Sequence, residues 1–191
     1  MNDVAKFVQD YKELLTLAVA TAGGMFALWR WTVDQKWRRV LHAQSLIEKF
    51  FQKENTIKAI DVLDIVDEEV EFEFPDKSIK PIKLTNDFLI GALSTFDQKE
   101  ENDEREIVVR AILGDFFEDL SAFQNHIDAG LIKTKDIKPY LEYWIQELTG
   151  MGRVHDEIRF GVQVGKYLGY FRYTRVLVLA QNMGYPFPKK P

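Results

Sequence analysis

The chain of 191 residues contains no cysteine, only three histidines and no surplus of basic residues. The absence of cysteine excludes disulfide bonds, thiolate zinc sites and cysteine nucleophiles. The formal net charge of −5 argues against a general nucleic-acid-binding protein, because such proteins carry an excess of lysine and arginine. We therefore expect no nucleic-acid partner.

The histidines are also poorly spaced for a metal site. His42, His126 and His155 form neither a His-x-x-x-His nor a Glu-x-x-His pair, so helix-borne zinc and di-iron sites lack their ligands. No set of nucleophile, base and orienting group stands out elsewhere. We expect no metal, no cofactor and no catalytic residue.

What the chain does contain is apolar material. Hydrophobic residues make up 46% of the sequence and charged residues 29%, which is typical of folded proteins. The longest apolar run, "LLTLAVATAGGMFALWRWTV", covers residues 14–33. Twenty helical residues rise roughly 30 Å, the thickness of the hydrocarbon core of a bilayer. This run predicts a transmembrane helix.

Two other interpretations of the run remain open. A buried core helix of a soluble protein has a similar length and also tolerates the polar Thr16 and Thr21. A cleaved signal peptide fits less well, because residues 1–13 contain three acids against two lysines, where a basic region is normal.

The residues at the end of the run and just after it resemble a membrane interface. Tryptophans favour the headgroup level, and basic residues favour the cytoplasmic side. The positive-inside rule therefore places the N-terminus outside and the rest of the chain in the cytoplasm. The predicted interface residues are Trp29, Arg30, Trp31, Lys36, Trp37, Arg38 and Arg39.

Small residues are spaced regularly in two places. Ala20, Gly23 and Gly24 give the predicted membrane helix a face on which two helices can approach closely, although small residues are common in spanning helices. Self-association through this face is left open.

Near the C-terminus, Gly161, Gly165 and Gly169 share one face of a predicted helix over residues 157–183. Because glycine weakens a helix by about 1 kcal/mol relative to alanine, we expect a close contact, a partner or a break in the helix to compensate.

The remaining pattern is mainly helical. Periodicity predicts helices over residues 36–54, 55–69 (capped by Asn55 or Thr56), 85–96, 103–129 and 133–149, with Gly130, Gly150 and Gly184 after helix ends. "VEFEFPDKSIKPIKL" alternates apolar and charged residues around a turn, which predicts a β-hairpin over residues 70–84. Pro81 restricts its second arm to the edge of a sheet.

Acidic residues gather in two places. Seven acids and no base lie between Asp61 and Glu73, a block that either docks a basic partner or simply keeps the chain soluble. On the helix over residues 103–129, Asp115, Glu118 and Asp119 share one face, either as a carboxylate patch or as ordinary solvated surface.

The layout resembles a group of uncharacterised bacterial membrane proteins. The resemblance rests on "WRWTVDQKWRRVLHAQSLIEKFF" after a short anchor and on "VVRAILGDFFEDLSAFQNHIDAGLIKTKDI", and it covers about residues 14–150. It implies a membrane-tethered helical domain and no catalytic residues. The hairpin and the glycine-spaced last helix depart from it.

The expected fold is mainly α: a transmembrane helix continues into a cytoplasmic helical bundle with one small β-hairpin. The expected segments are an extracytoplasmic N-terminus (1–13), the membrane helix (14–33), the cytoplasmic domain (34–184) and a tail (185–191). The expected location is the cell (inner) membrane.

The expected function is that of a membrane-tethered interaction or scaffold protein without catalysis. Its expected partners are the lipid bilayer, an unidentified protein and a second copy of the chain. One alternative is an enzyme or small-ligand receptor near the membrane, with a site around Asp115, Glu118 and His126. Another is a soluble subunit whose first helix is buried by a partner.

Overall fold

The computed structural model describes residues 2–65, 67–99, 101, 103–151 and 157–188, and the side chains of these residues except 2–10, 13 and 157. The chain divides into two compact units, Met1–Leu41 and His42–Pro191. Each unit is described by itself.

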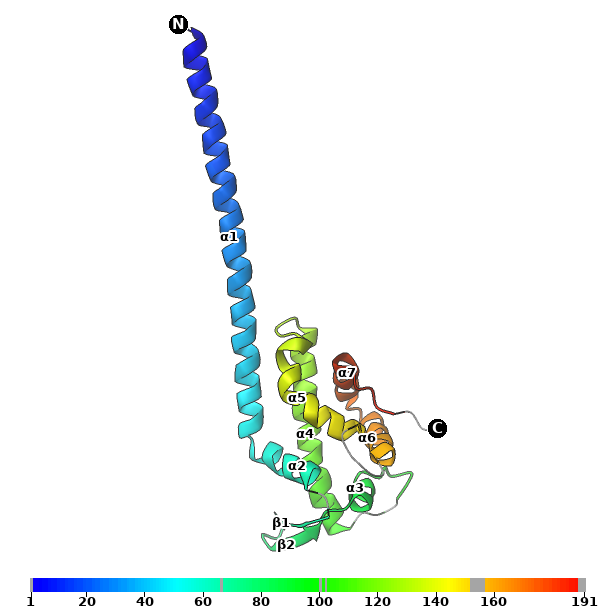
Figure 1. Cartoon of the computed structure of the whole chain (residues 1–191). Coiled ribbons are helices and arrows are strands. Elements are labelled where there is room, and N and C mark those ends of the chain that lie inside the picture. Colours follow the sequence, from blue (N-terminus) through cyan, green and yellow to red (C-terminus); the bar gives the residue numbers. More distant parts are fainter. Residues whose placement is uncertain (1, 66, 100, 102, 152–156, 189–191) are drawn as a thin grey trace. The chain divides into compact units, whose positions relative to one another are not determined.

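The first unit consists of the N-terminal part of helix α1, which runs from Asn2 to Gln52 (Figure 1). No proline interrupts it, and Gly23 and Gly24 lie within it. As predicted, the helix continues without a break beyond residue 33. The last part of α1, from His42 to Gln52, belongs to the second unit.

The rest of the second unit is mainly helical with one two-stranded sheet, which confirms the predicted fold class for the described residues (Figure 1). Its elements are α2 (Glu54–Asp64), β1 (Glu69–Glu73), β2 (Ile79–Lys83), α3 (Asn86–Ala92), α4 (Glu104–Asp128), α5 (Thr134–Thr149), α6 (Glu157–Tyr170) and α7 (Thr174–Met183).

Helix α4 is the centre of this unit and contacts α2, α3 and α7. It begins with a capping box, in which the Asp103 carboxylate accepts from the Glu106 N–H and the Glu106 carboxylate accepts from the Asp103 N–H. Its apolar face is buried, and Phe116 and Phe117 are among the largest fully buried side chains. The predicted helix over residues 103–129 is thereby confirmed.

The hairpin is present with the predicted alternation. Antiparallel pairing sets Val70 opposite Ile82 and Glu71 opposite Pro81. Phe72 and Ile82 are buried, whereas Glu69, Glu71 and Glu73 are exposed. The apolar face of the ribbon therefore joins the core, which gives this two-stranded sheet the support that such ribbons need.

Four helices end in the same way, and one of these ends was not predicted. Gly130, Gly150 and Gly184 adopt positive φ after α4, α5 and α7, and the next residue donates its N–H to a carbonyl five residues back. Arg172, with φ of 64°, does the same after α6, where the Tyr173 N–H donates to the Leu168 carbonyl at 2.8 Å. The predicted single helix over residues 157–183 is wrong, because this turn divides it into α6 and α7.

Three other predicted details are also wrong. The N-cap of α2 is Lys53 instead of Asn55 or Thr56, which both lie inside the helix. The side chains of these two residues are engaged elsewhere: the Asn55 amide donates to Asp115, and the hydroxyl of the buried Thr56 lies 3.4 Å from Asp119. Helix α2 ends at Asp64 instead of residue 69, and α3 ends at Ala92 instead of residue 96.

Candidate functional site

The apolar stretch of α1 is exposed along its whole length. Among the described residues, α1 is the one helix that is long and apolar enough to cross a membrane, and none of its apolar window is buried. Trp29, Trp31 and Trp37 are 61%, 60% and 62% exposed. A helix of this length and composition also occurs as a signal sequence or as the core helix of a soluble protein.

The other predicted interface residues lie on the same helix. Arg30, Lys36 and Arg38 are exposed, and Arg39 is half-buried. The Arg38 Nε donates to Asp34 at 2.8 Å, one helical turn away. Because Lys36, Arg38 and Arg39 outnumber Asp34, the stretch after residue 33 is predominantly basic even with this pair formed.

The predicted packing glycines fall into different surroundings. Gly23 and Gly24 face open space, as does Gly169 near the end of α6, and Ala20 is exposed. A Cβ on Gly161 would lie 2.6 Å from the Thr149 carbonyl carbon, so glycine lets α6 approach the end of α5. A Cβ on Gly165 would lie 3.3 Å from Phe187 in the tail.

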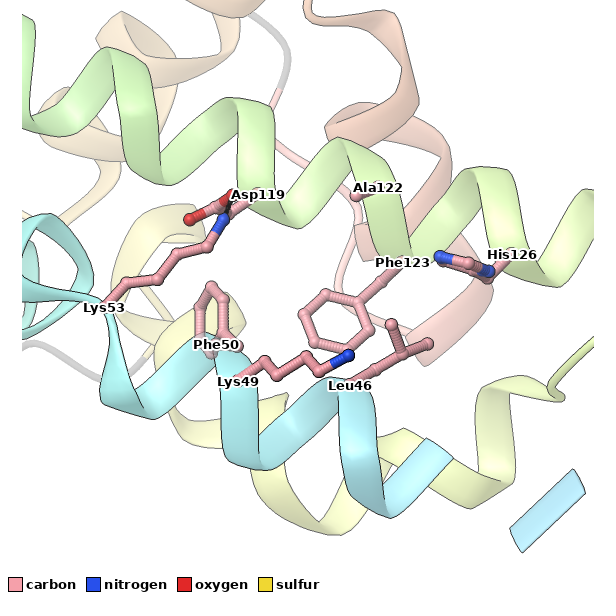
Figure 2. Close-up of a pocket in the computed structure, with 8 residues that line it drawn as sticks. All are labelled: Leu46, Lys49, Phe50, Lys53, Asp119, Ala122, Phe123 and His126. Carbon is pink, nitrogen blue, oxygen red and sulfur yellow. Dashed lines mark hydrogen bonds and ion pairs between the residues drawn. The ribbon is translucent and has the colours of Figure 1, made fainter. Parts of the chain in front are cut away.

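A second surface feature is the groove between the last part of α1 and α4, which we call the α1–α4 groove. It contains a hollow of about 160 Å³ that is open to the surface. Helix α1 contributes three residues, Lys53 follows its last residue, and α4 contributes four residues that face them in Figure 2. The groove is lined by Leu46, Lys49, Phe50, Lys53, Asp119, Ala122, Phe123 and His126.

The middle of the groove is apolar and aromatic. The Phe50 ring lies 5.5 Å from that of Phe116 and 5.3 Å from that of Phe123, centroid to centroid. Phe50 and Phe123 are buried, and Leu46 packs against the same core. Ala122 is exposed, so its small side chain leaves the groove accessible.

Polar side chains lie at the two ends of this apolar middle (Figure 2). At one end, the Lys53 ammonium pairs with the Asp119 carboxylate. At the other end, His126 Nδ1 lies 3.4 Å from His42 Nε2. Burial, and then the nearby His42, lower the pKa of His126 below its ordinary value of 6.5. The neutral imidazole is therefore the favoured form at neutral pH.

Two of the three neighbouring carboxylates on α4 are held by residues near the start of α2. Asp115 accepts from the Asn55 amide, and Asp119 is held by Lys53 and Thr56. Glu118 is exposed and lines a shallow hollow with Asp115 and Asp119. These bonds connect the start of α2 to α4, and His126 takes no part in them.

Within the described part of the chain, no three His, Cys, Asp or Glu side chains gather as metal ligands. His155 lies outside the described residues. In the acidic block, Asp64 accepts from the Tyr143 hydroxyl at 2.6 Å and Glu73 pairs with Lys77, while Glu69 and Glu71 are exposed.

The sequence alone did not reveal the α1–α4 groove, although each half has a helical signature. His42, Leu46, Lys49 and Lys53 recur at helical spacing, as do Asp119, Ala122, Phe123 and His126. Each series thus marks one helix face. Only the tertiary structure shows that the two faces meet.

No protein-family model matches the chain, and no curated protein or solved structure was found to be similar to it.

Proposed function

We propose that the chain is a membrane-tethered interaction protein, with α1 spanning the bilayer over residues 14–33 and the second unit in the cytoplasm. The supporting observation is that α1 is long and apolar enough to cross a membrane and that none of its apolar window is buried. In water such a surface would be costly, at about 25 cal/mol for each Å² of apolar area, whereas a lipid environment removes that cost.

The polar groups of this stretch are compatible with lipid. The hydroxyls of Thr16 and Thr21 donate to the carbonyls of Lys12 and Leu17, each at 2.8 Å, and Thr32 donates to the Trp29 carbonyl at 2.7 Å. Each hydroxyl is therefore satisfied within the helix, as the hydrocarbon core requires.

The orientation follows from the basic residues after the span. Lys36, Arg38 and Arg39 lie on the C-terminal side, where the positive-inside rule and anionic headgroups favour them, by about 1 kcal/mol each. The second unit would then present its exposed acidic hairpin to cytoplasmic partners.

Membrane extraction tests the anchor. Full-length chain should stay in the membrane during carbonate washing and leave it only with detergent. The double variant Leu17→Lys with Phe26→Lys should be released by carbonate. A matched control, Ile79→Lys with Phe96→Lys, adds the same charges at exposed apolar residues of the second unit and should remain in the membrane. Release of the unaltered chain by carbonate would contradict the proposal.

The absence of cysteine gives a direct test of orientation. Single cysteines at Asn2→Cys and Lys83→Cys can be labelled with a membrane-impermeant maleimide on intact cells. We expect Asn2→Cys to react at once and Lys83→Cys only after the membrane is permeabilised. The reverse order would place the second unit outside.

A further inference from the structure

The α1–α4 groove combines an apolar interior with an unpaired positive charge. Phe50 and Phe123 supply aromatic surface, and Leu46 and Ala122 supply aliphatic surface. Small-molecule sites have this character: mostly apolar walls with a few polar groups that fix orientation. The open hollow of about 160 Å³ has about the volume of the closed engineered cavities of about 150 Å³ that bind benzene.

The charges around the groove favour an anion. Lys53 is neutralised by Asp119, whereas Lys49 forms no ion pair with any described residue. His126 supplies no negative charge, and its ring contacts that of His42. The side chains that line the groove therefore carry one positive charge in excess.

We propose that the α1–α4 groove binds a small monocarboxylate whose apolar group is about the size of a six-membered ring. The apolar group lies in the groove against Phe50 and Phe123, and the carboxylate pairs with the Lys49 ammonium. The Lys49 side chain is exposed and can follow the carboxylate without disturbing the core.

The volume of the hollow suits a small ligand better than the two acyl chains of a membrane phospholipid. A two-chain lipid has an acyl volume several times that of benzene, which already fills a cavity of about 150 Å³. The inference is separate from the membrane tether, since every residue it uses belongs to the second unit.

The test uses the full chain in nanodiscs of zwitterionic lipid, with empty nanodiscs as reference. Saturation-transfer NMR with benzoate and hexanoate should show saturable binding, with Kd in about the millimolar range expected for ligands of this size. Benzylamine, of similar shape and opposite charge, should bind at least about tenfold more weakly. Equal binding of benzylamine would overturn the assignment of an anion.

Two variants locate the binding site. Lys49→Glu should weaken benzoate binding at least about fivefold, whereas Lys166→Glu, which makes the same change at an exposed lysine on α6, should leave it unchanged. Ala122→Trp places a large side chain in the groove and should abolish binding while the melting temperature stays close to that of the unaltered chain.

A direct signal keeps the proposal testable if a variant fails to fold. In the unaltered chain, the methyl resonances of Leu46 should shift on benzoate addition, and those of Leu131, an exposed leucine outside the groove, should not. The proposal would be overturned if benzoate binding were not saturable, or if only the Leu131 methyl resonances shifted. It would also be overturned if added phospholipid displaced bound benzoate and hexanoate did not.

Discussion

His42 Nε2 and His126 Nδ1 lie 3.4 Å apart and connect the last part of α1 with the last turn of α4. Their rings meet edge to face, with centroids 5.1 Å apart. A hydrogen bond between two ring nitrogens needs one donor and one acceptor, and only a neutral imidazole offers an acceptor. The contact is therefore lost when both rings are protonated.

This pair predicts a dependence of stability on pH. Burial and His42 lower the pKa of His126, so the folded chain binds fewer protons than the unfolded chain just below pH 6.5. The contribution of His126 to the free energy of unfolding should be greatest above about pH 6.5 and should decrease as the pH is lowered below that value. Thermal unfolding in neutral detergent at about pH 7.5 and about pH 5.5 measures the difference.

Two variants separate the causes of this shift. His126→Gln should reduce the difference between the two pH values, and His42→Gln should reduce it less, because burial of His126 is the larger cause. An unchanged difference in His126→Gln would show that other groups control the acid sensitivity.

The packing of Phe50 between α1 and α4 should contribute strongly to the stability of the second unit. Phe50 is 3% exposed, and its ring contacts those of Phe51, Phe116 and Phe123. Phe50→Ala should lower the free energy of unfolding of the second unit by about 3–5 kcal/mol, because it leaves a cavity in the core. Phe51→Ala, at a partly buried neighbour, should cost clearly less in the same guanidinium titration.

The sequence predicts those parts of the fold whose signals are local. Alternation in "VEFEF" is enough to place the hairpin, and the Asp103–Glu106 capping box marks the start of α4. Gly130, Gly150 and Gly184 mark helix ends, because glycine enters the left-handed region without a steric penalty.

The parts that could not be predicted depend on tertiary contacts. Arg172 carries no sign of a helix end, yet it adopts the same positive φ as the three glycines, and the Tyr173 that follows stacks on Tyr167 at 6.3 Å between centroids. His42 and His126 are separated by 84 positions, so no local pattern brings them together. The α1–α4 groove was missed for the same reason.

The small-residue face of α1 predicts self-association in the membrane. Gly24 faces open space, so a second helix can approach its backbone closely. Gly24→Leu should reduce energy transfer between labelled copies in vesicles several-fold, whereas Met25→Leu, at the next position of the helix, should leave it unchanged. Equal transfer in all three chains would show that α1 does not pair through this face.

We expect substitution by alanine to change the free energy of unfolding in opposite directions at Gly161 and Gly169. In Gly161→Ala the new methyl would lie 2.6 Å from the Thr149 carbonyl carbon, so α6 must move away from the end of α5, at a cost of about 1–3 kcal/mol. In Gly169→Ala the methyl meets nothing within 4 Å, and the better helix propensity of alanine should add up to about 1 kcal/mol. Guanidinium unfolding of the two variants should therefore shift in opposite directions. If both variants were stabilised, α6 would not need its close approach to α5, and Gly161 would have no packing role.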